Sequence, residues 1–135
     1  MTSTAAHTPA QSTRTRRVDD ATARRELQAL EPLFHHEALG SGREVFASLI
    51  VDDYWEIGAS GSRYDRDFVL DTLVERHRAP HDDPWTILDF TVRALGAETW
   101  LATYTLRQGD RVTRRSTVWQ HTDRWRAVYH QGTLA

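Results

Sequence analysis

Cysteine and lysine are both absent from the 135 residues of this chain. Without cysteine, the chain can form no disulfide, no thiolate nucleophile and no cysteine-ligated zinc site. All 17 basic residues are arginine, a bias that is typical of a GC-rich bacterial genome and carries no functional information. Long apolar runs are missing as well. None approaches the ~20 residues that a membrane-spanning helix needs, so we expect no membrane partner.

A large excess of one charge is also missing. The net charge of -2 does not favour a nucleic-acid partner, and the 39% hydrophobic and 27% charged residues are typical of a globular domain. Residues 1–17 contain no acid and lack the apolar core of a secretory signal. We predict a disordered tail over 1–18 and one cytoplasmic domain over 19–135. An organelle transit peptide is the alternative for the acid-free start.

Three helices are predicted before the main sheet, over residues 21–36, 42–50 and 66–77. Pro32 lies inside the first and should kink or split it near Glu31, because proline has no N–H and its ring crowds the preceding turn. The expected N-terminal caps are Asp19-Asp20, a Ser41/Glu44 capping box and Asp65. The residues expected to face the core recur at helical spacing and are Leu27, Leu30, Phe34, Val45, Phe46, Leu49, Ile50, Phe68, Val69, Leu70, Leu73 and Val74.

Strands are predicted over most of the remaining chain. A strand over 53–58 and a short return strand over 63–64 precede the third helix. Four long strands follow over 85–95, 98–108, 111–121 and 124–132, joined by turns at Gly96-Ala97, Gly109-Asp110 and Thr122-Asp123. Helices followed by an antiparallel meander indicate an α+β fold, with the helices on one face of a curved sheet. The conical space between them is either filled by side chains or kept as a pocket.

The last two strands form a ribbon rich in arginine and aromatic residues. A turn centred on Thr122-Asp123 would pair Thr117 with Val128 and Arg115 with His130. Alternation then places Arg115, Thr117, Trp119, Val128 and His130 on one face, and Arg114, Ser116, Val118, Ala127 and Tyr129 on the other. Both faces mix apolar and polar residues, so the pattern does not decide which is buried. A bulge at Gly109 would change which residues of 98–108 share that face.

Three pieces of the sequence resemble a known superfamily. They are 56–61 (EIGASG) followed by 64–66 (YDR), 115–119 (RSTVW), and Trp125 through 130–133 (HQGT). Their order and spacing resemble the nuclear transport factor 2-like superfamily, which includes ketosteroid isomerases and SnoaL-like polyketide cyclases. Among its branches they look most like domain of unknown function 4440. The resemblance implies a cone-shaped, strongly curved antiparallel sheet wrapped around three N-terminal-side helices, with a pocket inside and a homodimer formed through the convex face.

The resemblance also implies that the Glu56 strand and one face of the ribbon look into the cone. Glu56 is then a candidate general base or ligand anchor, with a structural ion pair to Arg63 or Arg115 as the alternative. His130 is a candidate proton carrier, or a core histidine. Arg115 could bind a carboxylate or phosphate. The candidate ligand-binding residues are Trp55, Tyr64, Arg115, Thr117, Trp119 and His130, with Phe34 as a further wall.

Metal and cofactor sites are not predicted. His35 and His36 are neighbours on a helix, so their side chains diverge, and Pro80 interrupts the helix that a His77/His81 pair would need. The H-E-x-x-H, G-x-S-x-G and phosphate-loop patterns are all absent. We expect a protein that binds a small, largely apolar molecule with an acidic or carbonyl group. The alternatives are an enzyme that moves a proton beside a carbonyl, with Glu56 or His130 as its base, and an interaction module with a filled core.

Overall fold

The computed structural model describes residues 18–35, 42–78 and 84–135. Apart from Val18, the tail expected over 1–18 lies outside the described residues. The helical elements are α2 (Asp20–Leu30), the 3-10 helix η1 (Glu31–Phe34), α3 (Arg43–Ala47) and α4 (Arg66–Arg78). The strands are β1 (Ile50–Ile57), β2 (Arg63–Asp65), β3 (Trp85–Ala94), β4 (Thr99–Gln108), β5 (Arg111–His121) and β6 (Trp125–Leu134).

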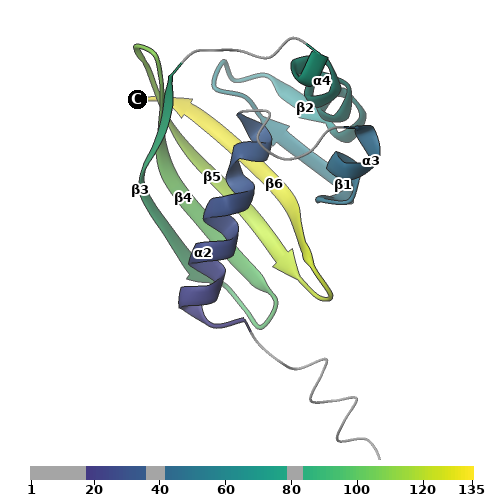
Figure 1. Cartoon of the computed structure of the whole chain (residues 1–135), viewed down its shortest axis with the longest axis vertical. Coiled ribbons are helices and arrows are strands. Elements are labelled where there is room, and N and C mark those ends of the chain that lie inside the picture. The colour runs from purple at the N-terminus through teal and green to yellow at the C-terminus, as the bar shows by residue number, and fades with distance from the viewer. Residues whose placement is uncertain (1–17, 36–41, 79–83) are drawn as a thin grey trace, which may run out of the picture.

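The strands form one six-stranded sheet in the order β2-β1-β6-β5-β4-β3. All neighbours run antiparallel except β1 and β6, which run parallel. Figure 1 shows a curved, unclosed sheet with α2 lying across one face and α3 and α4 gathered at the β1–β2 end. The α+β cone architecture expected from the sequence is confirmed. Within the described residues, no helix combines the length and apolar composition that crossing a membrane requires.

Pro32 divides the first helical segment as predicted. The Asp19 side chain caps α2 by accepting a hydrogen bond from the Thr22 backbone N–H at 2.7 Å. The α-helix ends at Leu30, and the chain continues as η1, which contains Pro32. Every residue of η1 is buried, including the acidic Glu31. This tight turn carries the chain from the surface helix into the centre of the cone.

The second helix is shorter than predicted. It ends at Ala47, and Ile50 belongs to β1, where it pairs with Ala127 of β6. The β-branched run at this point favours the extended strand over another helical turn. Val45 was expected in the core but is 40% exposed, while Phe46 is fully buried. Ser41 of the expected capping box lies outside the described residues, and Gly42 holds the cap position with φ of 106°.

The third helix begins as predicted. Asp65 caps α4 by accepting a hydrogen bond from the Phe68 backbone N–H at 2.9 Å. Val69, Leu70 and Leu73 are buried. Phe68 was expected to face the core but is 51% exposed, and its ring stacks on Tyr64 with centroids 4.7 Å apart.

The β4–β5 hairpin keeps one register through its turn, where Gly109 has φ of 59°, so no bulge lies there. The register shift falls instead in β6, where Val128 is the extra residue. This shift and a longer turn make the expected ribbon pairs wrong by two residues: Thr117 pairs with His130, and Arg115 with Gly132. The bulge also moves Ala127, expected on the opposite face, to the inner face beside Trp119.

Candidate functional site

A cavity of about 460 Å³ lies between α4, the β1–β2 turn and the inner face of the sheet. Its size is within the range of small-molecule sites, roughly 300–1,000 Å³. Its lining residues are Phe34, His35, Glu56, Gly58, Ala59, Ser60, Tyr64, Phe68, Val69, Thr72, Leu73, Arg76, Gln108, Arg111 and Arg115.

The charged side chains of the cavity are mainly cationic. Arg76 from α4 and Arg111 and Arg115 from β5 line it, opposed by the carboxylate of Glu56. Arg76 donates a hydrogen bond to the Phe34 carbonyl at 2.8 Å. The Arg115 Nε donates to Thr113 Oγ1 at 3.0 Å, which holds the guanidinium against the sheet. Burial lowers the pKa of Arg115, yet a guanidinium remains charged in proteins.

Glu56 sits where β1 runs beside the end of β6, opposite His130. Its Oε1 accepts a hydrogen bond from the Tyr54 hydroxyl at 2.7 Å. Burial raises the pKa of Glu56, while the Tyr54 hydroxyl and the charge of Arg115 act in the opposite direction. A cavity-facing carboxylate with a raised pKa can anchor a donor group or take a proton.

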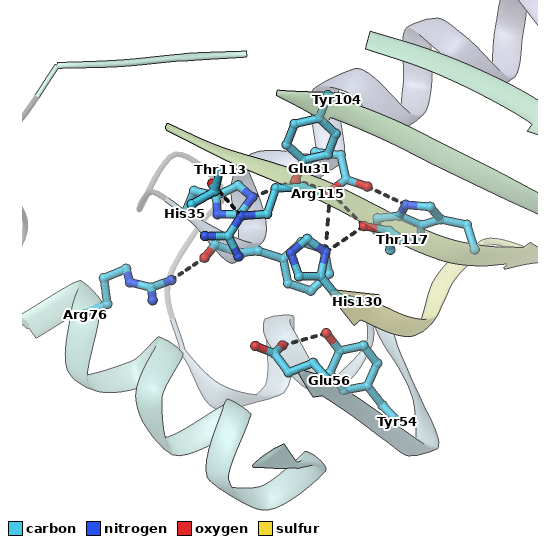
Figure 2. A network of polar contacts seen from close by, with 12 residues as sticks. Glu31, His35, Tyr54, Glu56, Arg76, Tyr104, Thr113, Arg115, Thr117 and His130 are labelled. Carbon is cyan, nitrogen blue, oxygen red and sulfur yellow. Dashed lines mark hydrogen bonds and ion pairs between the residues drawn. The ribbon is translucent and has the colours of Figure 1, made fainter. Parts of the chain in front are cut away.

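Behind the cavity wall lies a second carboxylate, Glu31, which is fully buried (Figure 2). Its Oε1 accepts hydrogen bonds from the Tyr104 hydroxyl at 2.6 Å and the Thr117 hydroxyl at 3.0 Å. Its Oε2 accepts from the Trp119 indole N–H at 2.7 Å. Burial raises the pKa of Glu31 to about 7, although the three donors act to lower it. The group therefore changes charge near neutral pH.

Two histidines extend this arrangement. His35 Nε2 lies 2.6 Å from the Tyr104 hydroxyl, and His130 Nδ1 lies 2.7 Å from the Thr117 hydroxyl and 4.0 Å from Glu31 Oε1. The His130 ring stacks on Phe34 with centroids 4.2 Å apart. Burial holds the pKa of both histidines well below the usual value, so both are neutral. The buried network consists of Glu31, His35, Tyr104, Thr117, Trp119 and His130.

The structure separates the residues that the sequence singled out. Glu56, Tyr64 and Arg115 line the cavity, as does Phe34. Thr117, Trp119 and His130 are buried in the network and do not line it. They can influence a ligand only through other side chains.

Trp55 was expected to be a cavity wall, and this expectation is wrong. Its ring packs on Tyr129 with centroids 4.4 Å apart, and the Arg63 guanidinium lies 4.2 Å from the Trp55 ring centroid. Neighbouring residues of a strand point to opposite faces, so Trp55 and Glu56 cannot both look into the cone. Arg63 is thereby engaged by an aromatic ring on the outer face.

Several site residues were missed by the sequence analysis: Glu31, His35, Arg76, Tyr104 and Arg111. One had a usable signal. Glu31 follows Leu27 by four residues, so it continues the apolar face of the helix immediately before Pro32. An acid at such a position is rarely left unpaired when buried. For Tyr104 and the arginines, neither spacing nor composition separates them from ordinary strand and helix residues.

No group of three or more potential metal-ligating side chains converges in the parts of the chain that the structure describes. His36 and His81, which belonged to the histidine pairs considered from the sequence, lie outside the described residues. The charged side chains that line the cavity are three arginines and one glutamate, and arginine repels cations rather than binding them.

Solved structures share this architecture. An uncharacterised protein with a cystatin-like fold from Caulobacter vibrioides has a TM-score of 0.63 at 18% identity, covering 81% of this chain and 84% of the other. A nuclear transport factor 2-like protein from Cytophaga hutchinsonii has a TM-score of 0.60 at 16% identity, covering 82% of this chain and 92% of the other. A candidate ketosteroid isomerase from Parabacteroides distasonis has a TM-score of 0.60 at 11% identity, covering 82% of this chain and 85% of the other.

No protein-family model matches the sequence, and no curated protein matches it. The comparisons give no support to the narrower branch, domain of unknown function 4440. At these identities a structural likeness establishes architecture and leaves activity open. The chain has the nuclear transport factor 2-like fold that its motifs predicted.

Proposed function

We propose that the protein binds a small organic acid in the cavity. The ligand's carboxylate, or another acidic group, would sit between Arg76 and Arg115, and its apolar part would lie against the walls near Tyr64 and Leu73. The observation that carries this proposal is the charge of the lining: three arginines face one glutamate. The ligand class expected from the sequence, apolar with an acidic or carbonyl group, fits this lining.

The physical argument rests on how arginine recognises anions. A guanidinium offers several N–H donors in a planar fork that matches a carboxylate, and such charge-assisted bonds are stronger in a partly desolvated site. Arg115 is half-buried, and Arg76 is oriented by its bond to the Phe34 carbonyl. Neither cation needs large rearrangement to accept an anion, so the site is largely preorganised.

The first test is a thermal-shift panel of aromatic and aliphatic carboxylates, with ketones, lactones and steroids as neutral comparisons. We expect carboxylates to stabilise the protein, because a ligand at 100 times its dissociation constant adds about 2.7 kcal/mol. Arg115→Met should weaken a hit by roughly 10- to 100-fold, the value of one charge-assisted bond. Arg63→Met is the matched control, since it removes an arginine from the outer face.

A second variant displaces Arg115 without removing its charge. A Cβ at Gly132 would clash with the guanidinium of Arg115, so Gly132→Ala should push that group aside and weaken the same hits. Equal affinities in wild type, Arg115→Met and Gly132→Ala would reject the assignment of Arg115. Stabilisation by neutral compounds alone would reject an acid as the ligand.

The second candidate function is an enzyme that moves a proton next to a carbonyl. It is favoured by one observation: Glu56 faces the cavity, and burial raises its pKa. His130, the other candidate base, does not line the cavity, so Glu56 carries this proposal. Incubating each hit with protein in deuterated water would reveal exchange at the carbon beside its carbonyl. Glu56→Gln should abolish exchange and retain binding, whereas a pure binder shows no exchange in either protein.

We further infer a homodimer formed through the outer face of the sheet. An apolar row crosses four strands there: Leu101 pairs with Val118, Val118 with Tyr129, and Tyr129 with Trp55. These side chains are only half-buried in the single chain. A contiguous apolar row on a sheet face is typical of a protein interface. Light scattering on the purified protein measures this directly, and the mass of one chain would contradict it.

A further inference from the structure

A continuous chain of short hydrogen bonds runs from the cavity wall into the core (Figure 2). His35 lines the cavity, and its Nε2 lies 2.6 Å from the Tyr104 hydroxyl oxygen. That oxygen lies 2.6 Å from Glu31 Oε1. All three side chains are buried. We name this chain of His35, Tyr104 and Glu31 the relay.

The direction of each bond in the relay depends on the charge of Glu31. An ionised carboxylate only accepts hydrogen bonds, so the Tyr104 hydroxyl must donate to it. The tyrosine oxygen is then free to accept from His35, which requires the imidazole hydrogen on Nε2. A neutral imidazole carries one N–H, and Nδ1 is left as an acceptor. With Glu31 ionised, His35 therefore presents an acceptor as its second nitrogen.

Protonation of Glu31 reverses this order. Trp119 Nε1 can only donate, and it lies 2.7 Å from Oε2, so the proton is placed on Oε1. From there the carboxyl donates to the Tyr104 oxygen, and the tyrosine turns its own hydrogen towards His35 Nε2. The imidazole hydrogen must then sit on Nδ1. The second nitrogen of His35 changes from acceptor to donor while the ring stays neutral.

A competing branch leads from Oε1 through Thr117 to His130. Within the described residues, the Nε2 atom of His130 is buried and has no hydrogen-bond partner. The Nδ1 atom of His35 is not both buried and unpaired. A proton routed through Thr117 would leave a buried, unpaired N–H on His130. Such groups are rare in folded proteins because they lose hydration without gaining a bond. The branch that ends at the cavity is therefore favoured.

We propose that His35 is a cavity residue whose hydrogen-bonding polarity is set by the proton on Glu31 and relayed through Tyr104. The relay selects ligands: a ligand donor is matched when Glu31 is ionised, and a ligand acceptor when Glu31 is protonated. Burial, which raises the pKa of Glu31 to about 7, places this change in the neutral range. The other titratable or charged groups around Glu31 are Tyr54 and Glu56 on β1, Arg76 on α4, Arg115 on β5 and His130 on β6.

The same relay can move a proton out of the cavity. A ligand hydroxyl or enol gives its proton to His35 Nδ1, His35 Nε2 gives one to Tyr104, and Tyr104 gives one to Glu31 Oε1. The ligand becomes an anion, Glu31 becomes neutral, and no imidazolium forms. The new anion lies in a cavity lined by Arg76 and Arg115. This step rests on the proposed function, because it requires an acidic ligand in the cavity.

The relay itself is tested without a ligand. Side-chain nitrogen NMR on the full chain distinguishes the two neutral imidazole tautomers from imidazolium, and comparison with His35→Gln identifies the His35 signals. We expect the Nε2–H tautomer of His35 at alkaline pH and the Nδ1–H tautomer at acidic pH, with a midpoint near 7. One tautomer throughout, or an imidazolium forming at that midpoint, would overturn the proposal. Because no ligand is present, this result is independent of the ligand screen.

Three variants sharpen the test. In Glu31→Gln, the amide oxygen faces the Trp119 N–H and the amide nitrogen donates to the Tyr104 hydroxyl oxygen, so His35 should be locked as Nδ1–H at every pH. Tyr104→Phe should abolish the response of His35 to pH. Thr117→Val, the matched control on the other branch, should keep the response with its midpoint moved upward, since one donor to Glu31 is lost. Should Glu31→Gln fail to fold, the other two variants decide: switching that survives Tyr104→Phe or disappears in Thr117→Val refutes the relay.

Discussion

Glu31→Gln is expected to gain about 3 kcal/mol of unfolding free energy relative to wild type as the pH rises from 4.5 to about 8. The carboxyl has a pKa of about 7 in the folded protein against 4.5 as the ordinary value. A group whose pKa is higher in the folded state than in the unfolded state stabilises the protein fully at a pH below its unfolded pKa. This stabilisation is lost as the pH rises through its folded pKa. Glutamine has no proton to lose, so the variant lacks this loss.

The measurement is urea unfolding of both proteins across that pH range, compared as a difference. Burial lowers the pKa of His35 and His130, so these groups change stability in the opposite direction to Glu31. Their stabilisation of the folded state is lost as the pH falls below 6.5. Glu56, whose pKa is raised, acts in the same sense as Glu31. These groups are present in both proteins, so the difference reports mainly the titration of Glu31. A difference that stays constant with pH would show that Glu31 keeps an ordinary pKa despite its burial.

Trp119→Phe is expected to lower the unfolding free energy by about 3 kcal/mol at about pH 8, and by less in acid. The substitution removes the donor to Glu31 Oε2, which lies 2.7 Å from the indole nitrogen, and leaves space in a fully buried position. A lost hydrogen bond to a charged group costs about 1.5–3 kcal/mol, against about 1 kcal/mol for a neutral one. The loss should therefore grow as Glu31 ionises, and the pKa of Glu31 should rise further.

Trp125→Phe is the matched control for this prediction. Trp125 also donates its indole N–H to a carboxylate, Glu26 Oε1 at 2.9 Å, but Glu26 is only half-buried and water can replace the lost donor. Its cost should therefore be smaller. Equal pH dependence in the two variants would contradict a special role for the Trp119 bond. Chemical unfolding monitored by circular dichroism, which does not rely on the deleted tryptophan, measures both.

Much of the fold follows from local features of the sequence. Pro32 predicts the break between α2 and η1 because proline chemistry acts within one helical turn. Asp65 predicts the start of α4 because a cap bonds to a backbone N–H three residues away. Glycine-containing turns and alternating strands predict the meander. Each of these signals depends on neighbours in the chain, so it is visible without a structure.

The strand faces are only partly determined locally. Alternation placed Arg115, Thr117 and Trp119 together, and the structure keeps them together on the inner face. The bulge at Val128 and the longer turn have no clear mark in the sequence, and together they bring His130 opposite Thr117. The position of Trp55, by contrast, could have been predicted locally. Neighbouring residues of a strand point to opposite faces, so a cavity-facing Glu56 excludes Trp55 from the cavity.

By itself, the sequence determined the order of the elements and the α+β class, and its resemblance to a known superfamily implied the cone architecture. Only the tertiary structure decided that Glu31 is the central buried acid. The three side chains that donate hydrogen bonds to Glu31 follow it by 73, 86 and 88 residues, so no local sequence pattern predicts that they meet. Burial and long-range hydrogen bonds set the charge of that carboxyl, and both arise only when the helix end is packed against the sheet.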